Sequence, residues 1–213
     1  MRLGILALAI VWALAGTPGR ALATTVFERP AADPFLAGTL FSDLQRLREA
    51  ATPFALSQPA GIDALVWWGG YFSFEEVPNP GTSPFEIRFF ADTGAGPEAT
   101  PFLVAAVTAT ISAFPASLQQ FEYEARLPAE LALGAGLWWI SIVDVDTAPP
   151  TFAWRKGSEV ASSFSRPPAG GWEQTHGLAS VRLEGRVLPE PGPVLLAAIG
   201  LALLGARAQR HAR

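Results

Sequence analysis

The chain has 213 residues, of which 19 are acidic and 15 are basic, and it contains no cysteine. Its formal net charge is −4, and its length accommodates one domain of ordinary size. The absence of cysteine excludes disulfides, a thiol nucleophile, a lipidated N-terminal cysteine and any thiolate metal site. The domain must therefore depend on a buried core for its stability.

The first 23 residues have the pattern of a secretory signal peptide. Arg2 gives a basic start, residues 4–16 form an uncharged apolar run, and Ala21 and Ala23 form a small-x-small cleavage site. We expect cleavage before Thr24. An uncleaved membrane helix is the alternative, but the apolar run is short and ends in a Thr-Pro-Gly sequence.

Removal of both ends changes the charge of the chain. All 19 acidic residues lie between Thr24 and Glu190, whereas five of the 15 basic residues lie outside this segment. The exported segment therefore has a net charge of −9, from 19 acidic and 10 basic residues. Such a surface repels phosphate backbones, so we expect no nucleic-acid partner.

Residues 24–186 have the pattern of one all-β domain. The lead-in at 24–34 is expected to be extended, and 41–49 is expected to be a loop or a helical turn. Alternation and β-propensity predict strands at 50–56, 62–68, 85–89, 102–113, 121–127, 137–143, 151–154 and 181–187.

Segments rich in proline, glycine and small polar residues separate these strands, at 76–84, 92–101, 131–136 and 157–171. Gly69 and Gly70 should end or bend the strand before them. The apolar strand at 102–113 should be buried on both faces. Seven or eight short strands without a convincing amphipathic helix predict an antiparallel β-sandwich that is jelly-roll-like.

The C-terminal stretch 187–213 consists of three blocks: a proline-bracketed carboxylate, an apolar run at 194–206 and a basic end. A helix of 13 residues rises about 20 Å, whereas the hydrocarbon core of a bilayer is about 30 Å thick. The run should therefore act as a short transmembrane helix that holds a protein only modestly. Arg207, Arg210 and Arg213 favour the cytoplasmic side, with the domain outside.

This succession resembles the PEP-CTERM sorting signal, the C-terminal tag of bacterial proteins that an exosortase processes. The resemblance implies that an exosortase recognises Pro189, Glu190 and Pro191, cleaves near them and releases or transfers the body. It implies an inner-membrane intermediate, then a cell-surface or matrix location in a Gram-negative-type bacterium, in an exopolysaccharide or biofilm context. A plain single-pass anchor on a proline-rich stalk is the alternative.

The middle of the chain resembles the β-sandwich domains often found ahead of such tags. The resemblance covers most of 62–185 and implies a fold but almost nothing about function. It is carried by Trp67-Trp68-Gly69-Gly70-Tyr71, by Phe-Glu-Ile-Arg-Phe-Phe-Ala-Asp at 85–92 and by Ala-Gly-Leu-Trp-Trp-Ile-Ser-Ile at 135–142.

Tryptophan is abundant, with seven in the chain, and two adjacent pairs lie on predicted strands. Successive side chains of a strand point to opposite faces, so one member of each pair should be core and the other exposed or covered by a loop. An exposed tryptophan beside an acid could stack on a sugar ring. The residues considered for ligand contact are Trp67, Trp68, Tyr71, Trp138 and Trp139, although core packing is the favoured interpretation.

The acidic pairs do not form a complete metal site. The pair Asp144 and Asp146 lacks the third acid and the glycine of a calcium loop, while Glu122 and Glu124 suit the solvent face of a strand. The sequence at 94–99 fits a dinucleotide fingerprint with alanine last, but no helix can be made out after it, so we predict a turn. No metal or cofactor is predicted.

Catalytic motifs are missing around the candidate residues. His176 is the only histidine of the exported segment, and no G-x-S-x-G or H-E-x-x-H surrounds any candidate. We therefore expect a non-catalytic structural or adhesive surface protein. The alternatives are a carbohydrate-binding module that uses exposed tryptophans, with extracellular polysaccharide as partner, and a glycoside hydrolase with two carboxylates about 5–10 Å apart in a cleft.

Overall fold

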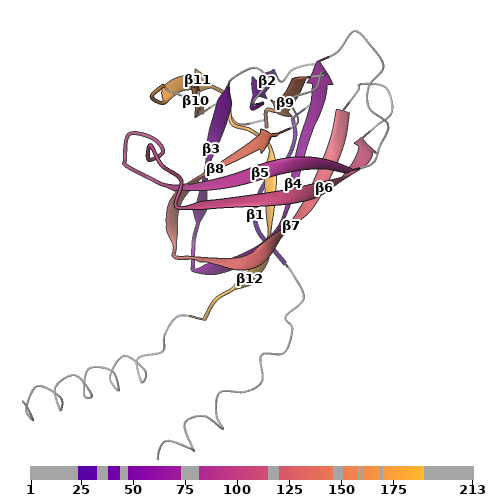
Figure 1. Cartoon of the computed structure of the whole chain (residues 1–213). Helices are drawn as coiled ribbons and strands as arrows, with labels where there is room; N and C mark the ends of the chain where they lie inside the picture. The colour runs from indigo at the N-terminus through magenta and orange to yellow at the C-terminus, as the bar shows by residue number, and fades with distance from the viewer. Residues whose placement is uncertain are drawn as a thin grey trace, which may run out of the picture.

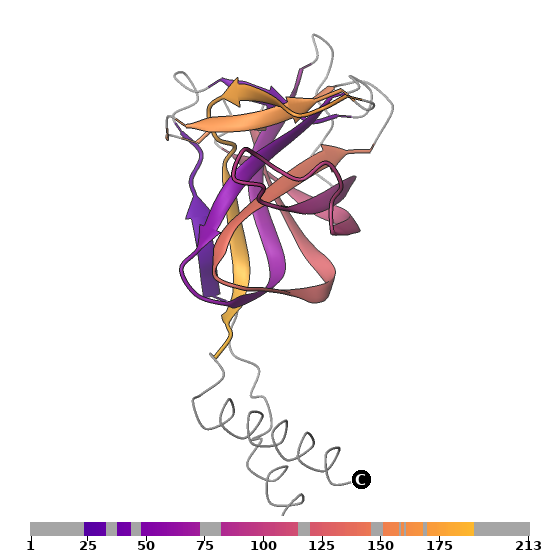
Figure 2. The same cartoon turned by 90° about the vertical axis from the view of Figure 1, so that its left-hand side faces the viewer.

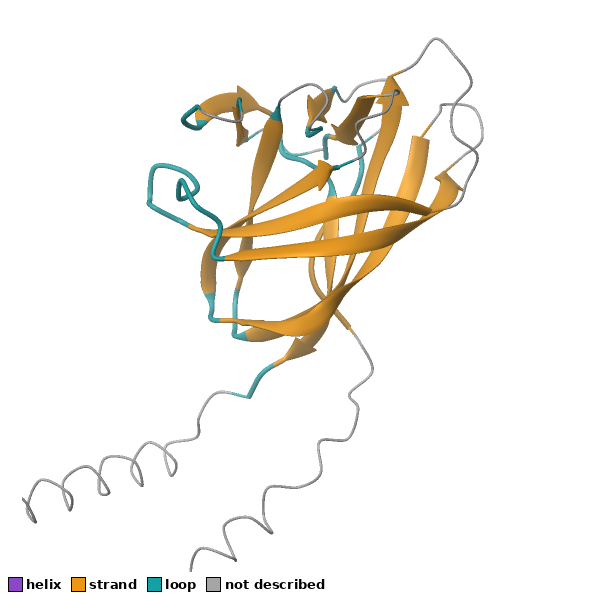
Figure 3. Ribbon diagram, viewed as in Figure 1, coloured by secondary structure: helices purple, strands orange, loops and turns teal. Residues whose placement is uncertain are grey.

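The structure is a computed structural model, and it consists of strands and the loops that join them (Figure 3). The residues that it describes are 24–32, 38–43, 48–72, 82–114, 120–145, 151–157, 159, 161–167 and 170–189. Within these ranges no helix is long and apolar enough to cross a membrane. The predicted signal peptide 1–23 and the apolar run 194–206 lie outside them.

Twelve strands are present in the described residues. They are β1 (Thr24–Arg29), β2 (Thr39–Phe41), β3 (Glu49–Leu56), β4 (Ala60–Phe72), β5 (Thr82–Ala91), β6 (Leu103–Phe114), β7 (Gln120–Leu133), β8 (Gly136–Asp144), β9 (Thr151–Arg155), β10 (Ser162–Arg166), β11 (Glu173–His176) and β12 (Val181–Val187).

All eight predicted strands are confirmed, but several details of the prediction were wrong. Of the two outcomes expected at Gly69 and Gly70, an end of the strand is excluded, because β4 continues to Phe72. The predicted loop at 157–171 contains β10, and the predicted turn at 131–136 is confined to residues 134–135. The extended lead-in is the paired strand β1, and β2 and β11 were not predicted.

The strand β6 is not buried on both faces, as its apolar composition had suggested. Its odd-numbered residues Ala105, Val107 and Ala109 are buried, whereas Val104 and Thr108 are exposed. Alanine and threonine suit this exposed face as well as they suit a core, because both are small and neither carries a charge. Composition alone therefore did not distinguish a two-sided from a one-sided strand.

The strands form one antiparallel sheet in the order β1-β12-β4-β7-β6-β5-β8-β3-β10-β11 (Figure 1). In the described sheet, β4 has three partner strands. It pairs with β7 on one side, and with β12 and then β9 on the other. β9 in turn pairs with the short strand β2.

The sheet curls so that β1 approaches β3, although the two are not hydrogen-bonded neighbours in the described sheet. Aromatic contacts cross the enclosed space between strands that do not pair. The ring of Phe27 in β1 lies 5.8 Å from that of Phe54 in β3, and Trp67 in β4 lies 5.1 Å from Phe85 in β5. The hydrophobic core therefore fills the inside of the curl.

Arg29 joins the two approaching strands. Its guanidinium, which is buried, donates hydrogen bonds from β1 to Thr52 Oγ1 and the Pro53 carbonyl in β3, and to the Ala179 carbonyl. Its Nε also donates to Glu159 at 3.1 Å. Burial lowers the pKa of Arg29 from its ordinary value, and the bond to Glu159 offsets part of this effect.

A close backbone approach joins β12 to β4. A Cβ added at Gly185 would lie 1.8 Å from the carbonyl oxygen of Gly61, so only glycine fits there. This position coincides with the irregularity in the pairing of the two strands. The approach brings β12 tightly against β4.

The first and last strands along the chain are β1 and β12. β1 begins, and β12 ends, at the same end of the sheet. Thr24 pairs with Gly185, two residues before β12 ends at Val187. Figure 2 shows the start of β1 and the end of β12 together below the curled sheet. The residues predicted to follow the signal peptide and to precede the sorting motif are thus neighbours.

Candidate functional site

Two of the aromatic residues considered for ligand contact lie inside the curled sheet. Trp67 is fully buried, and its indole stacks on the ring of Tyr123 at 5.5 Å and 6°. Tyr71 is 8% exposed and meets the ring of Phe152 at 5.8 Å. Phe85 packs edge-on against Trp67, Tyr123 and Phe152.

These five rings form one cluster drawn from β4, β5, β7 and β9. Edge-to-face and stacked aromatic pairs add about 0.5–1.5 kcal/mol each beyond the burial of their area. The cluster therefore stabilises the packing of strands from different parts of the sheet. It leaves neither Trp67 nor Tyr71 accessible to a ligand.

Trp68 faces the opposite side of β4 but is also buried, with an exposed fraction of 6%. Its indole Nε1 donates to Glu122 Oε2 at 3.0 Å, and the guanidinium of Arg182 lies 5.9 Å from its ring. The side chains of neighbouring strands thus cover this tryptophan. Glu122, which was expected on the solvent face of its strand, is half-buried by this contact.

The second tryptophan pair divides between two environments. Trp139 is 5% exposed, donates its Nε1 hydrogen to Asp92 Oδ1 at 2.8 Å and meets Phe164 edge-on at 5.2 Å. Trp138 is half-buried, packs against the ring of Phe102 at 5.6 Å and donates to the Gly134 carbonyl. Only Trp138 of this pair reaches the surface.

The structure buries four of the five aromatic residues considered for ligand contact. Trp67, Trp68, Tyr71 and Trp139 are buried by the core and by neighbouring side chains. Both members of the Trp67–Trp68 pair are covered, because strands and charged side chains close over the two faces of β4. The described residues do not form a groove lined by two exposed members of this set.

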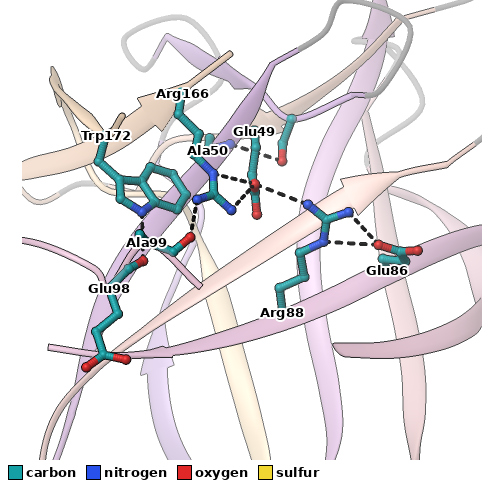
Figure 4. A network of polar contacts seen from close by, with 9 residues as sticks. Glu49, Ala50, Glu86, Arg88, Glu98, Ala99, Arg166 and Trp172 are labelled. Atoms are coloured by element: carbon teal, nitrogen blue, oxygen red, sulfur yellow. Dashed lines mark hydrogen bonds and ion pairs between the residues drawn. The ribbon is translucent and has the colours of Figure 1, made fainter. Parts of the chain in front are cut away.

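The most extensive polar cluster lies on the outer face of the sheet, where β10 meets β3 (Figure 4). Glu49 Oε2 accepts hydrogen bonds from Arg166 and lies 3.1 Å from Arg88 Nη1. Arg88 in turn bonds Glu86, and the indole of Trp172 lies 4.2 Å from the guanidinium carbon of Arg166. We call these five residues the Glu49 network.

The Glu49 network is mostly shielded from solvent. The side chain of Glu49 is 8% exposed and those of Arg166 and Arg88 are 14% and 19% exposed. Burial alone would lower the pKa of Arg88, but its bonds and charges from Glu86 and Glu49 raise it above its ordinary value. Two carboxylates balance two guanidiniums, so the cluster is a neutral link rather than a charged binding site.

This network fixes the β10–β11 hairpin to the sheet. Arg166 also bonds the Ala99 carbonyl, and Trp172 donates to the Glu98 carbonyl at 2.9 Å. Beneath it, Phe90 packs edge-on against Trp172. The sequence carried no signal for this cluster, because its members come from distant segments and no two form a known motif.

The interior acids do not form a site that a substrate can reach. Asp43 and Asp144 are both 1% exposed and adjoin each other in a parallel bridge. Asp43 Oδ2 accepts from the Phe152 backbone N–H at 2.7 Å. Asp146 lies outside the described residues, within which no group of three or more potential metal ligands is found.

The turn predicted at 94–99 is confirmed. Gly94 has φ +80° and Gly96 has φ +146°, both in the region that favours glycine. A Cβ at Gly96 would also lie 2.9 Å from the ring of Phe164. The glycines therefore serve the turn and its packing against β10, and no helix follows them.

The residues of the predicted sorting motif begin where the sheet ends. The Leu188 backbone N–H donates to the Pro59 carbonyl at 2.8 Å, and Pro189 is exposed. The other residues assigned to processing lie outside the described ranges: Ala21, Ala23, Glu190, Pro191, Arg207, Arg210 and Arg213.

No family model matches the chain, and no curated protein matches it. Its function must therefore be inferred from the residues and their arrangement.

Replacement of Glu49 should show the structural role of its network. In Glu49→Gln the guanidiniums of Arg88 and Arg166 lose the carboxylate between them, and we expect the free energy of unfolding to fall by about 2–3 kcal/mol. Urea unfolding of residues 24–186 measures this change. Glu130→Gln, at an exposed ion pair with Arg186, is the control and should change little. An equally small change in both variants would contradict the proposed role.

Alkaline titration should show that both tyrosines of the chain are buried. Burial raises the pKa of Tyr71, with a smaller contribution from the Asp144 charge, and burial raises that of Tyr123. Unfolded tyrosine ionises near pH 10, so the stability from these groups is complete below about pH 10 and is lost above it. We expect no tyrosinate absorbance from the folded protein at about pH 11. Tyrosinate formation near pH 10 with native circular dichroism would contradict this.

Proposed function

We propose that the chain is an exported, non-catalytic surface or matrix protein of a Gram-negative-type bacterium. Its body, residues 24–186, is delivered through a signal peptide at 1–23 and a PEP-CTERM sorting signal at 187–213. An exosortase recognises Pro189, Glu190 and Pro191 and cleaves near them. The body then acts in an exopolysaccharide or biofilm context, as the resemblance implies.

The observation that best supports this proposal is the position of the two processing points relative to the fold. β1 begins at Thr24, the first residue after the predicted signal cleavage, and β12 ends at Val187, two residues before the tripeptide. Cleavage at either point removes no strand and no core residue from the part of the chain that the structure describes. The exposure of Pro189 is compatible with access by a membrane-embedded protease.

The non-catalytic role is supported by how the chemically versatile side chains are used. Asp43 and Asp144 are buried, and Glu49 is held between two arginines. The aromatic residues that might have stacked on sugars mainly form the core, so the carbohydrate-binding alternative has lost most of its support. We further propose that the curled sheet belongs to the jelly-roll-like β-sandwiches, because aromatic contacts join its two halves across the core.

Intact mass of the surface-associated protein from a strain of origin tests the proposed processing. We expect the wild-type chain to lack residues 1–23 and the basic end that includes Arg213. Glu190→Gln should keep that end, since the recognised carboxylate is gone. Glu173→Gln, which removes an exposed carboxylate from β11, should be processed like the wild type. If the wild-type protein still carries Arg213, the proposed cleavage does not occur, and the C-terminal stretch is an ordinary membrane anchor.

A further inference from the structure

The end of the sheet from which the sorting signal departs has an unusual surface. Strand pairing places Val187, Ala60 and Leu133 in one row across β12, β4 and β7, and Leu56 opposite Gly136 in β3 and β8. Turns at 57–59 and 134–135 join the two rows. We call this region, together with residue 137, the tail-side end; it lies opposite the β10–β11 hairpin (Figure 1).

The tail-side end carries almost no charge, although the exported segment has a net charge of −9. The segments 50–62, 131–143 and 187–189, from which this end is built, contain no charged residue. The neighbouring charges of Glu130 and Arg186 form a bidentate pair with two 3.0 Å hydrogen bonds, and they cancel. The acidic surface of the body therefore lies elsewhere.

Large apolar side chains are exposed on and beside this uncharged end. Leu137 is 45% exposed and Val187 is 46% exposed. Next to Leu137, Trp138 is half-buried and packs against Phe102, which is 46% exposed. Single exposed apolar residues are common on proteins, but here Phe102 contacts a tryptophan whose N–H is already bonded, and Leu137 and Val187 lie in uncharged segments. Such amphipathic tryptophans favour the interface between lipid and water.

A short tether holds this end near the predicted membrane segment. Seven Cα–Cα steps separate Val187 from Val194, where the apolar run begins, so the two are at most about 25 Å apart. A tether of this length keeps the effective concentration of the body at the membrane high. Weak contacts of a few apolar side chains are then sufficient to orient the body.

We infer that the tail-side end is a lipid-contact surface, which rests on the outer leaflet of the bilayer while residues 194–206 are inserted. The inference rests on the proposed function, because it requires that insertion. The occupant of the surface is lipid rather than a second copy of the chain, because the tether leads from this end to the apolar run. The body then stands with the β10–β11 hairpin directed away from the membrane.

The absence of cysteine allows a direct test with single labelled positions in the full-length chain. Leu137→Cys, Gln174→Cys and Leu201→Cys each carry one environment-sensitive fluorophore. The proteins are reconstituted into phosphatidylethanolamine–phosphatidylglycerol vesicles that contain lipids brominated along their acyl chains. Gln174 is exposed in β11, at the opposite end of the body, and is the matched control.

We expect strong quenching at position 201, several-fold weaker but clear quenching at 137, and none above background at 174. Quenching at 201 with equal, low values at 137 and 174 would overturn the lipid-contact inference and leave the membrane insertion standing. No quenching at either 201 or 137 would overturn both. Quenching at 137 without quenching at 201 would contradict insertion of the tail and would overturn the inference, which requires that insertion.

A charged substitution gives a second readout on the same surface. With the label at Val187→Cys, the additional change Leu137→Glu should abolish most of the quenching, because a carboxylate at this end opposes contact with lipid. The same charge added by Gln174→Glu should leave the quenching unchanged. Equal effects of both substitutions on the quenching would overturn the inference. Circular dichroism like that of the wild type shows that each variant is folded.

Discussion

The buried guanidinium of Arg29 is the interaction on which the closure of the sheet depends. β1 pairs along its length only with β12, and its other side faces β3 without strand pairing between them in the described sheet. Arg29 bridges that gap by bonding Thr52 and the Pro53 carbonyl, where β3 has passed beyond its partner β10. Thr52 Oγ1 also accepts a hydrogen bond from the Ala179 N–H, so the same group of hydrogen bonds includes the segment before β12. The position of the N-terminal strand, and hence of the two proposed processing points, depends on this closure.

The curled sheet also explains why the aromatic residues have a structural use. A sheet that closes on itself has an interior wide enough for stacked rings, and Trp67, Phe85, Tyr123 and Phe152 fill it. On the outer face, the Glu49 network, which includes Trp172, covers a second, smaller cluster around Trp139 and Phe90. A domain without disulfides thus gains its stability from two aromatic clusters and a few shielded ion pairs. This economy suits a protein whose proposed role is to be displayed rather than to catalyse.

The sequence predicted the strands whose residues alternate or carry β-branched and aromatic side chains, such as 85–89 and 181–187. It did not predict β10 and β11, because Ser-Ser-Phe-Ser-Arg and Glu-Gln-Thr-His have no apolar periodicity and pair only through tertiary contacts. It predicted that Gly69 and Gly70 end or bend a strand; β4 continues through them, and glycine is required at 69 because a Cβ would lie 2.6 Å from the ring of Phe152. The burial of Trp68 beneath Arg182 and the sharing of Glu49 by Arg88 and Arg166 depend on segments at least 39 residues apart. No local pattern could have indicated either contact.

Hydrogen exchange of Arg29→Met against the wild-type segment tests the closure most directly. Loss of the guanidinium leaves the Pro53 carbonyl without this donor and removes one of the donors to Thr52 Oγ1, at a cost of about 1–3 kcal/mol. We therefore expect amides of β1 and of residues 52–56 to exchange about tenfold faster or more, by local opening, with smaller changes in the β5–β6 hairpin. Unchanged protection of β1, or a uniform increase across β1, β5 and β6, would contradict the claim that Arg29 closes the sheet.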